Sequence, residues 1–143
     1  MTEPDPGIPV APTPRVVLEH YHRAMLSMAA DDLADLYAVD AVHEFPFTSP
    51  GFPERFEGRE EVRAGYRAAW GASPAEVTEI RDVTVYETGD PGVIVSEHVV
   101  VGSLPARGLT FTVPGLLILH VRDGLIVRVR DYMDGFGVAA SRG

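Results

Sequence analysis

The feature that most constrains the fold of this 143-residue chain is a change of sequence texture at Pro74. Beyond it, apolar and β-branched segments of strand length replace the helical periodicity seen earlier in the chain. These segments are VTEIRDVTVYE, VIVSEHVVVGSL, LTFTVPGLLILHV and LIVRVRDYM, separated by TGDPG, PARG and RDG. Asp123-Gly124 is a strong hairpin signal, and the other two turns are compatible with hairpins. The four strands are therefore predicted to form an antiparallel meander.

Before Pro74 the sequence predicts three helices. Thr13 and Pro14 are typical of an N-cap followed by proline at the first helical position, and an apolar stripe continues to about Ala29. A second, short helix is expected in DDLADLYA, and a third in REEVRAGYRAAW, which has acidic residues in its first turn. Between them, AVHEFPF predicts a strand and TSPGFPERFEG a loop.

Helices followed by a curled sheet indicate a single α+β domain over residues 14–143, preceded by a proline-rich extended tail over residues 1–13. We expect a cone-shaped, curved antiparallel sheet wrapped on the N-terminal helices, with a ligand-binding hollow between them. Pro114 requires a sheet edge or a bulge. The strand VIVSEHVVV is mostly apolar on both sides, which favours a homodimer formed through the open face of the sheet.

Composition excludes several classes of function. A net charge of −9 argues against nucleic acid and anionic membranes as partners. The chain has no cysteine, and its five histidines are not at metal-ligand spacing, so neither a metal nor a cofactor is predicted. No apolar run approaches the roughly 20 residues that span a bilayer, and no secretion signal is recognisable. A cytoplasmic location is expected.

Asp131 interrupts the alternation of the last strand. It falls on the side of Val127, Val129 and Met133, which is otherwise apolar. Burying an unpaired carboxylate costs several kcal/mol, so Asp131 either pairs with an arginine, reaches solvent at the strand end, or serves chemistry. As a general acid or base, it would contribute about 10²–10⁴ in rate.

Two further polar residues lie on faces predicted to be buried. His98 shares a strand face with Ile94 and Ser96, where it is either a core residue or a partner of Asp131 acting through substrate or water. Tyr21 lies on the apolar stripe of the first helix, where it is either core or a hydrogen-bond donor to substrate.

Glu44 is the fourth candidate, because an inward position would pair its carboxylate with Asp131 and separate an acid from a base. Alternation alone does not decide whether the face of Glu44 or that of His43 and Phe45 points inward. The expected pocket wall consists of Tyr66, Trp70, Phe111, Val129 and Met133.

Three strings, together with the order of elements, resemble the nuclear transport factor 2-like (NTF2-like) superfamily and, within it, the SnoaL-like group. They are YHRAMLSMAADDLADLYAVDAVHEFP, FEGREEVRAGYRAAW and HVRDGLIVRVRDYMD, and the resemblance covers roughly Val16 to Asp134. It implies a cone-shaped α+β barrel. This superfamily hosts isomerases, aldol cyclases, epoxide hydrolases, dehydratases and binding proteins, so the resemblance alone does not choose an activity.

The string RDYMD is similar to the last strand of limonene-epoxide hydrolase-like members, which implies a water-activating role for Asp131. The central strand of that group carries Glu-Arg-x-Asp. Here His98 stands in place of the arginine and Val100 in place of the aspartate, while Glu44 stands where that group has an asparagine. The resemblance therefore carries over only one residue of the hydrolase triad.

Ketosteroid isomerase is matched at Tyr21, which implies an oxyanion donor, whereas Phe45 and Leu116 occupy the positions of its two acids. We predict a cofactor-independent enzyme for a small apolar or carbonyl compound, with Asp131 as base and His98 as its partner. An isomerase or aldol cyclase is favoured over an epoxide hydrolase. The alternative is a non-catalytic protein that binds a small apolar ligand.

Overall fold

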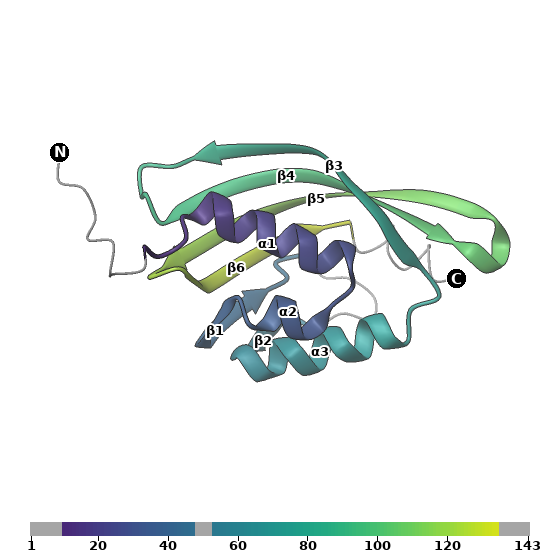
Figure 1. The fold of residues 1–143 in the computed structure, drawn as a ribbon, viewed down its shortest axis with the longest axis horizontal. Helices are drawn as coiled ribbons and strands as arrows, with labels where there is room; N and C mark the ends of the chain where they lie inside the picture. Colours follow the sequence, from purple (N-terminus) through teal and green to yellow (C-terminus); the bar gives the residue numbers. More distant parts are fainter. Residues whose placement is uncertain (1–9, 48–52, 135–143) are drawn as a thin grey trace.

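The computed structural model describes residues 10–47 and 53–134 (Figure 1). Its elements are α1 (Pro14–Leu26), α2 (Ala30–Ala34), β1 (Tyr37–Glu44), β2 (Arg55–Glu57), α3 (Arg59–Gly71), β3 (Glu76–Glu87), β4 (Val93–Leu104), a 3₁₀ turn (Pro105–Arg107), β5 (Leu109–Arg122) and β6 (Leu125–Met133). Most of the predicted tail, residues 1–9, and the end of the predicted domain, residues 135–143, lie outside the described residues. Residues 10–13 are exposed and irregular.

The six strands form one curved, open sheet in the order β2-β1-β6-β5-β4-β3. Strands β3 to β6 form the predicted antiparallel meander, and Asp123 and Gly124 both have positive φ, as a two-residue hairpin turn requires. The expectation of an all-antiparallel sheet is wrong at one place, since β1 pairs with β6 in parallel. Strand β2 lies inside the segment predicted as a loop.

Helix α1 begins as the sequence predicts and packs against the concave face of β3, β4 and β5 (Figure 1). The Thr13 side chain accepts a hydrogen bond from the backbone N–H of Val16, and Pro14 occupies the first turn. The buried stripe of α1 consists of Val17, Leu18, Tyr21 and Ala24. This stripe brings the Tyr21 side chain over the sheet.

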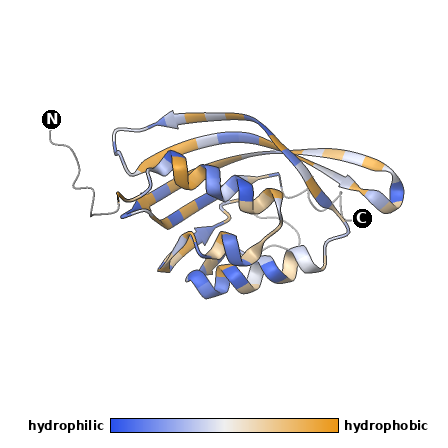
Figure 2. Ribbon diagram, viewed as in Figure 1, coloured by the Kyte–Doolittle hydropathy of each residue, from blue (hydrophilic) through white to orange (hydrophobic). Residues whose placement is uncertain are grey.

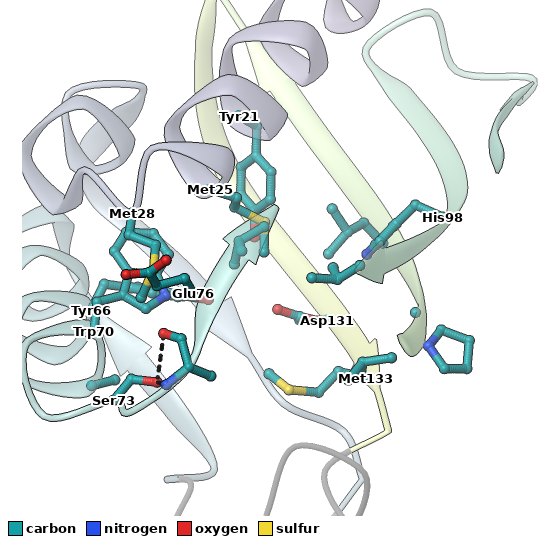
Figure 3. A pocket seen from close by; sticks show the side chains of 18 of the residues that line it. Tyr21, Met25, Met28, Tyr66, Trp70, Ser73, Glu76, His98, Asp131 and Met133 are labelled. Atoms are coloured by element: carbon teal, nitrogen blue, oxygen red, sulfur yellow. Dashed lines mark hydrogen bonds between the residues drawn. The ribbon is translucent and has the colours of Figure 1, made fainter. Parts of the chain in front are cut away.

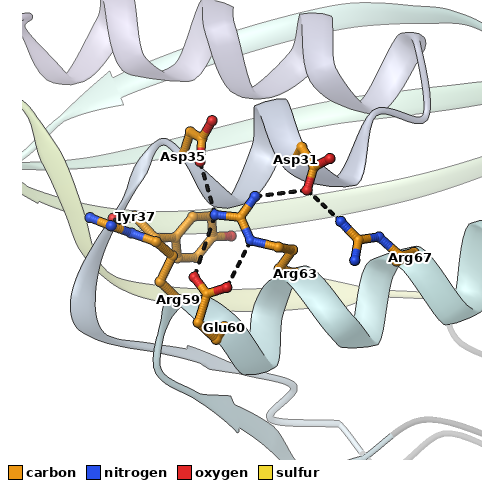
Figure 4. Close-up of polar contacts among 7 residues, drawn as sticks. All are labelled: Asp31, Asp35, Tyr37, Arg59, Glu60, Arg63 and Arg67. Carbon is orange, nitrogen blue, oxygen red and sulfur yellow. Dashed lines mark hydrogen bonds and ion pairs between the residues drawn. The ribbon is translucent and has the colours of Figure 1, made fainter.

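An ion-pair network fixes α3 against α2 (Figure 4). The Arg63 guanidinium contacts Asp31, Asp35 and Glu60 at 2.8–3.0 Å, and Arg67 contacts Asp31 at 2.6 Å. Solvent-exposed pairs of this kind add little to stability, so the network acts chiefly to set the position of α3. That position determines where the aromatic residues on the inner side of α3 lie.

The second helix is shorter than predicted, because Tyr37 begins β1 and is completely buried there. Pro114 lies where β5 loses β6 as a neighbour, since the described pairing of these strands begins at Gly115. This location meets the requirement for a free edge. Figure 2 shows hydrophobic residues alternating with polar ones along β4, β5 and β6. None of the described helices is long and apolar enough to cross a membrane.

Candidate functional site

A pocket of about 140 Å³ lies between α1, α3 and the concave face of β4, β5 and β6 (Figure 3). Its wall is mostly apolar and includes Tyr21, Met25, Tyr66, Trp70, Phe111 and Met133. An apolar cavity of this size accommodates roughly one aromatic ring. Polar groups are few, so each of them bears on what the pocket is able to bind or do.

Asp131 points into this pocket from the inner face of β6, opposite Leu117 of β5. It is 7% exposed and shares its buried side with Val129. The pairing of β5 with β6 shifts register after His120, and this irregularity turns Ile126 inward in place of Val127. The sequence argument that Asp131 lies on an apolar, buried face is confirmed from Val129 onward.

The carboxylate of Asp131 is held by His43, which sequence reasoning had not singled out. The distance from His43 Nε2 to Asp131 Oδ2 is 3.0 Å, and that from the Tyr37 hydroxyl to His43 Nδ1 is 2.7 Å. With a neutral imidazole and an ionised carboxylate, both contacts are satisfied when Tyr37 donates to Nδ1 and Nε2–H donates to the carboxylate. His43 is 0% exposed, so the hydrogen bonds from Tyr37 through His43 hold Asp131 Oδ2 from the buried side. The other carboxylate oxygen, Oδ1, is left for a ligand.

Three tyrosine side chains surround this pair. Burial raises the pKa of Tyr21, Tyr37 and Tyr66 well above the usual value, and the Asp131 charge raises each pKa further. Their hydroxyl groups therefore remain protonated donors at any ordinary pH. The Tyr66 hydroxyl also lies 3.4 Å from Nε2 of His43.

His98 reaches the pocket from the inner face of β4, directly opposite Gly115 of β5. A Cβ atom at Gly115 would lie 2.9 Å from His98 Nε2, so the missing side chain makes room for the imidazole. The Nδ1 atom of His98 is buried and has no hydrogen-bond partner among the described residues. The ring is thus not part of a satisfied core network, which favours a ligand-directed role.

Both His98 and its neighbour His22 on α1 are neutral near pH 7. Their ring centroids are 5.4 Å apart. Burial lowers the pKa of His98, with the Asp131 charge opposing that shift. Burial, followed by repulsion from His98, lowers the pKa of His22 to about 4. A neutral His98 is able to donate or accept a hydrogen bond without adding charge to the pocket.

A family model for the SnoaL-like domain matches residues 18–129. The chain belongs to the SnoaL-like family. A PhzA/B-like protein of Pseudomonas aeruginosa, itself uncharacterized, is 33% identical over 117 residues, covering 81% of this chain and 80% of the relative.

Solved structures agree with this assignment. A Bacillus subtilis protein classed provisionally as an isomerase is 26% identical, with a TM-score of 0.79 over 90% of this chain and 91% of its own. A Pseudomonas putida protein classed provisionally as a polyketide cyclase is 18% identical, with a TM-score of 0.72 over 93% and 100%, and this match shows the fold alone.

Within this SnoaL-like domain most of the predicted site residues come together. Asp131, His98 and Tyr21 line one pocket, as do the predicted wall residues Tyr66, Trp70, Phe111 and Met133. Val129 lies in the hydrophobic core next to the pocket and not on its wall. No group of three His, Asp or Glu side chains suited to hold a metal ion occurs in the part of the chain that is described.

Glu44 is not among the residues that line the pocket, so the pairing with Asp131 that an inward position would have given does not form. Its carboxylate accepts a hydrogen bond from Arg128 on the outer side of β6, which lowers the pKa of Glu44. The inward face of β1 instead carries Ala41, His43 and, just beyond the strand, Phe45. The aromatic neighbours of His43 were the only local sign in the sequence that this face points inward. Alternation by itself does not favour either face.

Proposed function

We propose that this SnoaL-like protein is a cofactor-independent enzyme that removes a proton next to a carbonyl group, as an isomerase or an aldol cyclase does. The observation that carries the proposal is the Tyr37–His43–Asp131 chain, which presents one carboxylate to an apolar pocket. A carboxylate with one oxygen fixed and the other open to a ligand is arranged as a general base.

In the proposed reaction, Asp131 Oδ1 accepts a proton from the carbon next to the carbonyl group. The C–H electron pair forms a carbon–carbon double bond, and the carbonyl oxygen becomes an enolate oxygen. Where a carbon–carbon double bond is conjugated with the enolate, returning the proton to the remote carbon of that system gives isomerisation. Attack of the enolate carbon on a second carbonyl group of the same molecule gives cyclisation, and the proton held by Asp131 then passes to the alkoxide oxygen formed from that carbonyl group. His43 keeps the carboxylate oriented through both steps, because its hydrogen bond to Oδ2 does not involve the reacting oxygen.

Enolate charge requires hydrogen-bond donors in this pocket. His98 faces the same cavity as Asp131, and strand β5 lies between their two strands. A carbonyl oxygen bound in the cavity between the two side chains would accept a hydrogen bond from neutral His98, with the protonated Tyr21 or Tyr66 hydroxyl as a further donor. Such preorganised donors contribute several kcal/mol to stabilising a developing oxyanion.

The rival function is a carrier that binds an apolar ligand without chemistry. A carrier requires only the aliphatic and aromatic wall, and burying Asp131 and His98 in that wall would weaken its binding of apolar molecules. The convergence of both polar residues on one cavity supports the enzyme.

Exchange of carbon-bound hydrogen tests the proposal without knowledge of the natural substrate. Acetophenone has one ring and one carbonyl group, and loss of its methyl proton signal in deuterium oxide reports proton abstraction directly. We expect the protein to accelerate this exchange, and Asp131→Asn to reduce the acceleration at least about a hundredfold. Equal exchange with the variant, at unchanged thermal stability, contradicts the role of Asp131.

We further propose that the enzyme is a homodimer formed through the outer face of the sheet. The helices cover the concave face, while Val95 lies beside Ile118 and Val99 beside Pro114 on the opposite face. Pairing two such faces would remove this apolar surface from water. Light scattering at micromolar concentration should give twice the mass of one chain, and a single-chain mass contradicts the dimer.

A further inference from the structure

The charged groups of the pocket all have the same sign. The described lining residues include two acidic side chains, Asp131 and Glu76, and no arginine or lysine. Glu76 begins β3 and is exposed, on the side of the pocket where Met28 and Trp70 lie (Figure 3). Asp131 lies toward Met133. A bound molecule that extends from Asp131 toward Met28 and Trp70 therefore approaches a second carboxylate, that of Glu76.

The arginine that lies in the neighbouring hollow is not paired with Glu76. A second, shallower hollow between α2 and α3 shares Trp70 and Glu76 with the pocket and includes Arg67, so the pocket opens toward this surface. The Arg67 guanidinium is bound to Asp31 at 2.6 Å, and no ion pair to Glu76 is found among the described residues. The protein as a whole has a net charge of −9, so its overall electrostatic potential is negative as well.

Aromatic rings complete the same environment. Tyr66 and Trp70 are in contact, with ring centroids 4.8 Å apart, and both line the pocket together with Phe111. The faces of such rings attract organic cations and give no comparable attraction to anions. Carboxylates and aromatic faces thus favour the same sign of ligand charge.

We propose that the natural substrate is an apolar, roughly ring-sized compound with a cationic ammonium group, which the Glu76 carboxylate holds at the mouth of the pocket. This inference rests on the proposed function for the reacting end, which lies against Asp131. A substrate with a carboxylate or phosphate at the mouth would meet Glu76 without a compensating cation. The substrate class is therefore an aminoketone or a similar basic carbonyl compound.

Binding of three compounds that differ mainly in charge tests the inference. Trp70 is the single tryptophan of the chain and lines the pocket, so its fluorescence reports binding without turnover. Benzylamine, benzyl alcohol and benzoate each have one ring and are cationic, neutral and anionic at neutral pH. At low ionic strength, where surface charges are least screened, we expect benzylamine to bind most tightly and benzoate most weakly.

Two variants locate the source of the preference. Glu76→Gln should weaken benzylamine about two- to fivefold and tighten benzoate by a similar factor, the range for an exposed charge pair. Glu79→Gln removes the same charge from the same strand at an exposed residue that does not line the pocket, and should leave the order and spacing of affinities unchanged.

Equal affinities, tightest binding of benzoate, or no detectable binding of benzylamine overturns the inference. A preference that disappears in Asp131→Asn and persists in Glu76→Gln also overturns it, because the cation would then lie at the wrong end. These outcomes are separable from those for the proposed function, because binding is measured here and hydrogen exchange there. Loss of the amine preference with Asp131-dependent exchange intact removes only the substrate class.

Discussion

The half-buried imidazole of His22 should make the free energy of unfolding depend on pH in acid, and one substitution should remove this dependence. The folded-state pKa of His22 is about 4, against an ordinary value of 6.5. Between these pH values the unfolded chain binds a proton that the folded chain does not bind, so the free energy of unfolding falls as the pH falls. A folded-state pKa of about 4 in place of 6.5 corresponds, at about 1.36 kcal/mol for a tenfold change in proton affinity, to about 3 kcal/mol when fully expressed. Because the ring is only partly buried, we expect about 2 kcal/mol.

The assay is urea unfolding followed by Trp70 fluorescence at pH 7.5 and 4.5, using His22→Gln, since glutamine is uncharged at both values. The wild-type protein should lose about 2 kcal/mol more than His22→Gln on acidification. His20→Gln, two residues earlier on α1, is the control and should follow the wild type. His98 and the carboxylates titrate in all three proteins, so their effects largely cancel. Equal losses in wild type and His22→Gln would show that His22 is not held neutral by the fold.

Two further predictions follow from the geometry of the site. Replacing His43 by phenylalanine removes the donor to a buried carboxylate, so it should lower the free energy of unfolding by about 2–4 kcal/mol in urea titrations. Tyr37→Phe leaves only Nδ1 of His43 unpaired, so it should lower the same free energy by about 1–2 kcal/mol. A larger loss for Tyr37→Phe contradicts the assigned order of donors. Gly115→Ala places a Cβ atom 2.9 Å from His98 Nε2. It should reduce the rate of acetophenone exchange at least about tenfold, with a change in thermal midpoint of only a few degrees. Gly89→Ala, whose Cβ meets nothing within 4 Å, is the control and should leave the exchange rate and the thermal midpoint unchanged.

The position of Asp131 illustrates how far sequence reasoning reaches into the site. Period-two alternation placed it on a buried face, and the structure shows it on the pocket wall. The same rule did not show which face of β1 is buried, because Glu44 and His43 occupy opposite faces of a short strand. Alternation states which residues share a face and does not state which face points inward. The parallel pairing of β1 with β6 decides it, and no local turn signal announces that pairing.

Side-chain partners show the same limit. Asp131 and His43 are 88 residues apart, and their contact depends on the neighbouring positions of β1 and β6. His98 lies two strands from Asp131, so the predicted partnership across the cavity requires a ligand between them. The absence of a side chain at Gly115 likewise matters only because His98 is its cross-strand neighbour.

The sequence by itself determined the elements whose causes are local. The N-cap at Thr13, the helical stripes, the Asp123-Gly124 turn and the antiparallel meander all follow from neighbouring residues and their periodicity. Only the tertiary structure decided which face of β1 is buried, which histidine pairs with Asp131, and that neither carboxylate of the pocket forms an ion pair with an arginine of the described residues. Those features depend on contacts between segments far apart in the chain, whose register is set by packing of the whole sheet against the helices.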